Sequence, residues 1–238
     1  MIIYGNHACR YAVEAGRKIY KIYLLKSKLA PQWITKGHAT KVLLLENGGF
    51  EQILPKDAVH QGIAMEVEDT QYADITELEH APRNCAIAIL DGVTDPHNMG
   101  AIIRSAVAFG ITSIIIGEKS SCKINGIVAK SASGGIEHIK IIVVKNLSQT
   151  IKKLKDFGFW VISFCERGER YLHEMDLTGK TCLIFGSEGD GIRRLQKENS
   201  DFIVKLPTCP NFPTLNVSAS SAIAFYETAK QNNFSLSQ

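Results

Sequence analysis

Three short segments of the sequence combine glycine, amide, hydroxyl and charged side chains in patterns that suit ligand binding. In the first, residues 90–104 (LDGVTDPHNMGAIIR), Pro96 interrupts a strand and Asn98 is a natural helix cap. Arg104 follows about two turns into an apolar helix. A charge there needs a partner or a bound anion, although a snorkelling arginine or an internal ion pair would also explain it.

The second segment, residues 183–194, carries Gly186, Gly189 and Gly191 directly after an apolar strand. Glycine lets the backbone approach a ligand closely or adopt positive φ. The order Gly-x-x-Gly-x-Gly differs from the dinucleotide-binding pattern, and the Lys-Ser/Thr of a phosphate loop is missing. Glu188 would repel a pyrophosphate, so the loop argues against a dinucleotide. A plain structural turn is the alternative.

The third segment, residues 206–224, places three prolines before Asn216 and Ser218, and a helix of small residues follows. Prolines stiffen the loop and keep it out of a sheet ladder. Either Asn216 or Ser218 is explained as the cap of that helix, and capping is compatible with ligand contact. The sequence contains no Gly-x-Ser-x-Gly, His-Glu-x-x-His or Cys-x-x-Cys motif, so acyl-enzyme and metal chemistry are disfavoured and we expect no metal.

The elements that must position these segments follow an α/β pattern. Apolar runs without polar alternation, separated by helical segments, predict a parallel sheet covered on both faces. Ligands of such sheets bind outside the carboxyl ends of the strands, where the three segments lie. The expected strands are 19–25, 42–45, 63–67, 85–91, 112–117, 139–144, 159–164, 181–186 and 202–206, and the expected helices are 7–17, 98–109, 147–157 and 217–230.

Charge is unevenly distributed, although the formal net charge is only +3. The Lys and Arg excess is +5 over residues 1–60 and +4 over residues 81–238, whereas residues 61–80 carry −6. Basic segments permit a nucleic-acid partner without proving one. The acidic stretch predicts a boundary that divides the chain into a small α/β domain, an acidic linker and a larger α/β domain: 1–75, 76–84 and 85–238.

Composition excludes several classes of protein. Hydrophobic residues make up 45% and charged residues 21%, which rules out a mainly disordered chain, a collagen and a coiled coil. No apolar run approaches the ~20 residues of a membrane helix, and no secretory signal is visible at the start. The six cysteines are scattered singly, as expected of buried hydrophobes. A cytoplasmic protein without a membrane partner is therefore expected.

Together, the three segments resemble the motifs of the SpoU/TrmH family of RNA 2′-O-ribose methyltransferases, in the knotted SPOUT class. The matching pieces are DPHNMGAIIR, FGSEGDG and LNVS (95–104, 185–191 and 215–218), in family order, with KSASGGIE (130–137) after the first. The resemblance covers essentially all of residues 84–230. The front segment, with YGNHA (4–8) and VHQG (59–62), looks like the L30e-type RNA-binding domain of the family's ribosomal-RNA branch.

The resemblance implies a C-terminal domain with a parallel sheet and a trefoil knot, preceded by an L30e-like domain that binds RNA. It implies a homodimer in which residues of the partner complete the RNA site. The implied reaction transfers a methyl group from S-adenosylmethionine to a ribose 2′-hydroxyl, and a guanosine in 23S ribosomal RNA is the expected target. The alternatives are a transfer-RNA methyltransferase of the same family, a non-catalytic RNA-binding module and a nicotinamide-dependent oxidoreductase.

The resemblance also assigns residues to roles. Arg104 is the catalytic residue of the family and is often described as a general base, but a guanidinium with a pKa above ~12 is better suited to stabilising an oxyanion or binding a phosphate. One departure is Thr214, where the family usually has serine. The implied catalytic residues are Arg104, Asn98, Glu188, Asn216 and Ser218, and the implied cofactor contacts are Gly186, Leu206, Leu215, Phe185 and Gly191.

Overall fold

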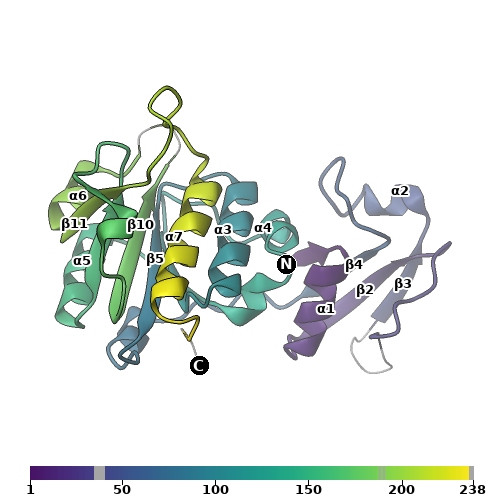
Figure 1. Cartoon of the computed structure of the whole chain (residues 1–238). Helices are drawn as coiled ribbons and strands as arrows, with labels where there is room; N and C mark the ends of the chain where they lie inside the picture. The colour runs from purple at the N-terminus through teal and green to yellow at the C-terminus, as the bar shows by residue number, and fades with distance from the viewer. Residues whose placement is uncertain (35–40, 188, 190, 236–238) are drawn as a thin grey trace.

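The structure is a computed structural model, and it describes residues 1–34, 41–187, 189 and 191–235. These residues form two sheets, one of four strands and one of seven. The four-stranded sheet lies at one end of the molecule and the seven-stranded sheet at the other, with helices between them (Figure 1). Glu188 and Asp190, in the glycine loop, lie outside the described residues.

The first sheet has the order β1-β4-β2-β3, in which β4 runs antiparallel to β1 and β2, and β3 runs parallel to β2. Helix α1 buries Ala8, Cys9 and Ala12 against one face. Phe50 and Leu54 pack on the other face. The helix and the three strands predicted here are confirmed within a few residues. The elements are β1 (Ile2–Tyr4), α1 (Asn6–Glu14), β2 (Ile19–Leu25), β3 (Lys41–Leu45), α2 (Asn47–Phe50) and β4 (Ile63–Val67).

The second sheet has the order β7-β6-β5-β10-β8-β11-β9, and each neighbouring pair is parallel. The predicted parallel sheet is therefore confirmed. Its strands are β5 (Cys85–Asp91), β6 (Ser113–Gly117), β7 (Lys140–Val144), β8 (Trp160–Phe164), β9 (Arg170–Tyr171), β10 (Lys180–Gly186) and β11 (Phe202–Lys205). The helices around it are η1 (Ile75–Leu78), α3 (Pro96–Ala108), α4 (Gly126–Ser131), η2 (Gly135–His138), α5 (Leu147–Asp156), η3 (Leu172–Glu174), α6 (Arg194–Asn199) and α7 (Val217–Gln231).

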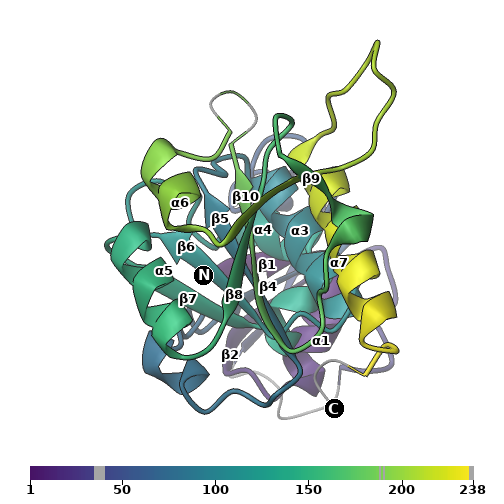
Figure 2. The same cartoon turned by 60° about the vertical axis from the view of Figure 1, so that its left-hand side comes forward.

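Helices cover both faces of the large sheet, with α5 and α6 on one face and α3, α4 and α7 on the other (Figure 2). Strand β5 is buried along its whole length, and its side chains alternate between the two cores. Ala88 and Leu90 face the α3–α7 side, whereas Ile87 and Ile89 face the α5 side. Burial on both faces explains why the strand reads as a continuous apolar run.

The chain reverses its direction of winding around β5. Strand β6 lies on one side of β5 and β10 on the other, so the loops after β5 and β10 diverge from neighbouring carboxyl ends. Such a switch point opens a crevice at that edge of a parallel sheet. The knot implied by the resemblance depends on how the chain threads and stays a prediction. Among the described residues, no helix is both long enough and apolar enough to cross a membrane.

Candidate functional site

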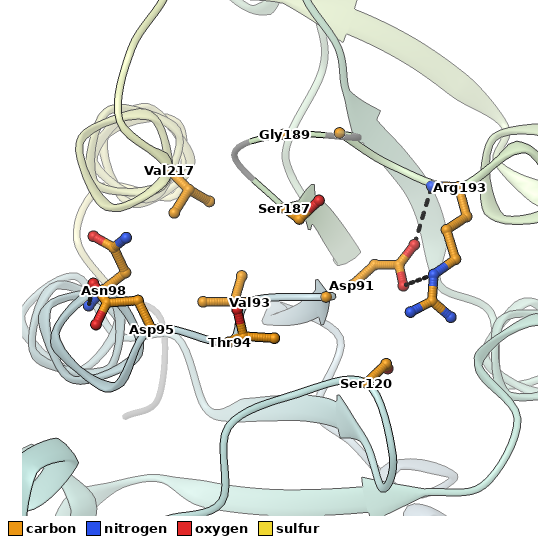
Figure 3. Close-up of a pocket in the computed structure, with 12 residues that line it drawn as sticks. Asp91, Val93, Thr94, Asp95, Asn98, Ser120, Ser187, Gly189, Arg193 and Val217 are labelled. Atoms are coloured by element: carbon orange, nitrogen blue, oxygen red, sulfur yellow. Dashed lines mark hydrogen bonds and ion pairs between the residues drawn. The ribbon is translucent and has the colours of Figure 1, made fainter.

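Two adjoining cavities open at the carboxyl ends of β5 and β10. The larger has a volume of about 620 Å³ and the smaller about 420 Å³. They share a wall made by Ser187, Gly189, Gly191 and Val217. Figure 3 shows the smaller cavity, where the loop after β5, the loop after β10 and the starts of α3 and α7 converge. The three sequence segments therefore meet at one place.

The start of α3 is fixed by Asp95, whose carboxylate accepts hydrogen bonds from the backbone N–H of His97 (3.0 Å) and of Asn98 (3.3 Å). Pro96 occupies the first turn, where its missing N–H costs nothing. The prediction that Asn98 caps this helix is therefore wrong. Asp95 is an equally good N-cap residue, and Pro96 directly after it is favourable in the first turn of the helix. The side chain of Asn98 is released from capping and lines the smaller cavity.

Asn216 caps α7. Its Oδ1 accepts hydrogen bonds from the backbone N–H of Ser218 (2.8 Å) and from the Ser218 hydroxyl (2.5 Å). Of the two capping residues that the sequence offered, Asn216 has this role. Its Nδ2 donates to Oδ1 of Asn98 at 3.0 Å, which links two segments 118 residues apart. Asn98, Asn216 and Ser218 are thus brought together.

The glycine loop is closed by its own backbone. Ser187 and Gly191 exchange hydrogen bonds of 3.2 and 3.0 Å. A Cβ on Gly186 would lie only 2.1 Å from the carbonyl carbon of Gly191, and Gly191 has a φ of +65°. Both glycines are needed by the turn itself, and the turn in turn forms part of both cavity walls.

The larger cavity is lined by all five residues that were predicted to contact the cofactor: Phe185, Gly186, Gly191, Leu206 and Leu215. Its other walls include Phe164 at the end of β8, Glu166 and Arg167 in the loop after β8, and Lys205. The rings of Phe164 and Phe185 stack with their centroids 4.7 Å apart. These residues were not predicted, because nothing in the local sequence marks the loop after β8 as part of the crevice.

Arg104 lies away from these groups. It is six residues beyond Asn98 on α3, which places it about 240° around the helix axis and about 9 Å along it. Its side chain is exposed, and it lines neither of the two cavities. Within the part of the chain that the structure describes, it makes no hydrogen bond or ion pair. The protein partner expected for Arg104 is not found among the described residues, because the helix presents the side chain to solvent, and the bound anion stays a prediction.

An ion pair that was not predicted joins Asp91, buried at the end of β5, to the half-exposed Arg193 after the glycine loop. Asp91 is 1% exposed, and its Oδ2 accepts a hydrogen bond from the backbone N–H of Arg193 at 3.1 Å. Its Oδ1 lies 3.4 Å from Nε of Arg193 (Figure 3). A buried carboxylate requires such a partner. The signal in the sequence was a carboxylate that ends a fully apolar strand.

The described residues contain no group of three or more His, Cys, Asp or Glu side chains arranged to hold a metal ion. The polar groups of the site are amides, hydroxyls, the Asp91–Arg193 ion pair and the charged side chains that line the larger cavity, among them Glu166 and Arg167. This set can orient and hydrogen-bond a polar ligand next to an apolar cavity.

Comparison with known proteins identifies both parts of the chain. Residues 86–226 match the model of the SpoU rRNA Methylase family, and residues 2–73 match that of the RNA 2′-O ribose methyltransferase substrate binding domain. The 23S rRNA (guanosine-2′-O-)-methyltransferase RlmB of Pseudomonas putida is 35% identical over 96% of this chain and 96% of its own. The Escherichia coli K12 protein of the same name is 32% identical over 98% of this chain and 99% of its own.

A similar solved structure is the SpoU methyltransferase AviRb from Streptomyces viridochromogenes in complex with AdoMet. It has a TM-score of 0.84 and 18% identity, and the match covers 98% of this chain and 90% of that chain. This likeness shows that the fold is shared across both domains. With its paired domain matches and its near full-length relatives, the chain belongs to the SpoU family of RNA methylases.

Proposed function

We propose that this protein transfers the methyl group of S-adenosylmethionine to the 2′-hydroxyl of a guanosine in 23S ribosomal RNA. Relatives that match it over almost their full length carry that activity in their names. The observation that carries the proposal is the hydrogen bond between Asn98 and Asn216 at the rim of a cavity that adjoins a second cavity of cofactor size.

The larger cavity fits the chemistry of S-adenosylmethionine, which joins an adenosine to a charged amino acid. Phe185, Leu206 and Leu215 offer apolar surface for the adenine, and Arg167 and Glu166 offer charges for the carboxylate and the ammonium. Its volume lies within the usual range of ~300–1,000 Å³ for ligand pockets. When bound, the cofactor supplies an electrophilic methyl group on a sulfonium. Backbone atoms of Gly186 and Gly191 would complete its cradle.

The smaller cavity is where we place the ribose. Transfer from a sulfonium has an excellent leaving group, so the protein mainly aligns the hydroxyl and stabilises the developing alkoxide. Asn98 lines this cavity, and Asn216 holds it by the 3.0 Å hydrogen bond. Ser218 fixes Asn216 through its hydroxyl. These three residues would position the nucleotide. Glu188 lies outside the described residues, and its role at the site stays a prediction.

The separation of Arg104 from the cavities supports a homodimer. Exposed apolar side chains of α7 and the following turn, Ile223, Tyr226 and Phe234, leave 45%, 48% and 57% of their surface in solvent beside α3. A second copy of the chain packed against these side chains would remove this apolar surface from solvent. We propose that Arg104 of the partner subunit then reaches the ribose, where its fixed positive charge stabilises the 2′-oxyanion.

Methyl transfer tests the activity directly. The purified protein should transfer tritium from methyl-labelled S-adenosylmethionine to a 23S rRNA fragment and leave the label in alkali-stable dinucleotides, because a 2′-O-methyl group blocks hydrolysis. Transfer RNA serves as the second substrate arm. Label in neither RNA contradicts the proposed function, and label in transfer RNA alone contradicts the ribosomal target.

Co-expression tests the shared site. Arg104→Ala and Asn98→Ala should each be inactive alone, whereas mixed dimers hold one intact site. Random pairing then restores about a quarter of the parental activity. If Arg104 acts within its own chain, the mixed dimers hold no intact site and stay inactive.

A further inference from the structure

One segment lies between the two domains and contacts both. Residues 126–138, which we term the bridging segment, comprise α4 and η2. Figure 1 shows α4 between α3 of the large domain and the small sheet with α1. It contains the whole KSASGGIE match (130–137), and Gly5 of YGNHA and Gln61 of VHQG lie against its Lys130. The proposed function assigns none of these residues a role.

The face toward the N-terminal domain has no room for side chains at two positions. A Cβ on Gly126 would lie 2.3 Å from the carbonyl oxygen of Ile2. A Cβ on Gly134, whose φ is +92°, would lie 2.2 Å from Cδ2 of Tyr11. Such distances are far below van der Waals contact, so glycine permits a backbone-level contact between the domains.

Polar groups lock the same face. Nη1 of Arg17 lies 2.7 Å from Oε1 of Glu137, and the two side chains are only 8% and 13% exposed. Nζ of Lys130 donates to Oε1 of Gln61 at 2.9 Å. The ring of Tyr11 meets that of His138 edge-on at 5.2 Å. A charge pair this well shielded exists only while the domains are in contact.

The opposite face packs against α3 as closely. A Cβ on Gly100 of α3 would lie 2.3 Å from Cβ of Ser131 and 2.7 Å from the carbonyl oxygen of Val128. Nδ1 of His97, next to Asn98, is 3.2 Å from the Ser131 hydroxyl. A Cβ on Gly135 would lie 3.5 Å from Cα of Arg104. The helix that carries Asn98 and Arg104 is thus held against the bridging segment.

A single apolar core runs through all three layers. Ile3 and Ile22 of the small sheet, Val128 and Ile136 of the bridging segment, and Ile103 of α3 belong to one cluster. Domains of one chain usually move relative to each other unless their interface is large and apolar. This interface is apolar at its centre, charge-paired and closed by glycine contacts, so the structure favours a fixed arrangement.

We propose that the bridging segment docks the substrate-binding domain onto α3 as one rigid body. The fixed distance between this domain and Asn98 then selects which nucleotide of a bound RNA reaches Asn98. Gly134, Arg17 and Glu137 are then positioning residues. The docking is independent of the proposed function, whereas the selection of a nucleotide rests on it. Two experiments separate these parts.

Calorimetry of the full chain tests the docking. The parent should unfold in one cooperative transition. Gly134→Ala should split it in two or lower it further than the matched control Gly158→Ala, because Gly158 has a similar φ of +84° but no atom within 4 Å of its Cβ position. Two independent transitions in the parent, or identical behaviour of the two variants, would overturn the docking.

Mapping the methylated nucleotide tests whether the docked domain selects the target. In Gly134→Ala, and in Glu137→Gln as a milder variant, affinity for S-adenosylmethionine and for the RNA fragment should stay within about twofold, while kcat falls roughly tenfold or more or the methyl group spreads to neighbouring nucleotides. Gly158→Ala and Glu198→Gln, which removes a surface pair, should keep the parental kcat and target.

Parental kcat and an unchanged target in both interface variants would overturn the proposed selection of the nucleotide by the docked domain. If the parent itself transfers no methyl group, the proposed function fails, while calorimetry still decides whether the domains are docked.

Discussion

Asn216 has two separable functions, and one pair of substitutions distinguishes them. Its Oδ1 caps α7, and its Nδ2 donates to Asn98 at 3.0 Å. Asn216→Ala removes both. Asn216→Asp keeps a capping oxygen of the same shape but has no hydrogen to donate to Asn98. Stability should therefore follow the cap, and methyl transfer should follow the contact with Asn98.

The magnitudes follow from these contacts. Losing an N-cap costs about 1 kcal/mol, which lowers the Tm of a protein of this size by about 2–4 °C. An aspartate keeps the cap and adds ~0.3–1 kcal/mol of favourable interaction with the α7 dipole, so Asn216→Asp should melt at or slightly above the parental temperature. Both variants remove the hydrogen bond from Asn216 to Asn98, and a misplacement of ~1 Å can slow transfer about 100-fold.

The assay combines thermal unfolding with single-turnover methyl transfer at saturating S-adenosylmethionine. Asn146→Asp is the matched control, because Asn146 caps α5 by accepting a hydrogen bond from Gln149 at 3.1 Å and belongs to neither cavity. That control should likewise melt at or slightly above the parental temperature, but it should keep the parental rate. Methyl transfer by Asn216→Asp at the parental rate, or melting of Asn216→Ala at the parental temperature, would contradict these two roles of Asn216.

Three further predictions follow from the site and the surface. Arg104→Ala should abolish transfer while the Kd for S-adenosylmethionine, measured by calorimetric titration, stays within about twofold, since Arg104 lies outside the larger cavity; activity within a few-fold of the parent would contradict this. Tyr226→Lys should convert a dimer to a monomer in light scattering, because it charges the exposed apolar patch, and a parent that is already monomeric would disprove the dimer. The ammonium of Lys140 holds the pKa of Glu77 below its usual value, so this ion pair stabilises the fold above pH ~4 and the stabilisation is lost as the pH falls further. The urea midpoint of the parent should therefore drop more steeply in acid than that of Glu77→Gln, and parallel plots of the two midpoints against pH would exclude this contribution.

The sequence predicted the large sheet well because of where its strands lie. Burial on both faces makes β5 and β6 continuous apolar runs, and that pattern is visible without a structure. The three-residue β1 was missed because a strand this short carries no periodic signal, and its place is set by pairing with β4, some sixty residues later. Local pattern thus identifies central strands better than edge strands.

The site was predicted in composition but not in geometry. The segments do converge, yet Asp95 and Asn98 are both good caps, and only the backbone shows that Asp95 wins. The outward position of Arg104 follows from helix phase against neighbours that the sequence does not reveal. The ion pair of Asp91 with Arg193 joins residues 102 apart, and no local pattern specifies such a pair.

The contact between the domains was hidden for a similar reason. Gly134 and Gly126 look like ordinary turn glycines until Tyr11 and Ile2 are seen against them. The need for glycine arises from another segment of chain, so spacing within the KSASGGIE match could not predict it. Arg17 likewise reads as one of several basic residues in a solvated face, whereas it is paired and buried.

The central claim is that this chain methylates a ribose, and mass spectrometry of the product nucleosides tests it most directly. A 23S rRNA fragment is incubated with the protein and S-adenosylmethionine carrying a deuterated methyl group, then digested completely and analysed by fragmentation. We expect one modified nucleoside, a guanosine whose label stays with the ribose fragment, and no such product with Arg104→Ala. Label on the base fragment, or no label at all, would contradict it.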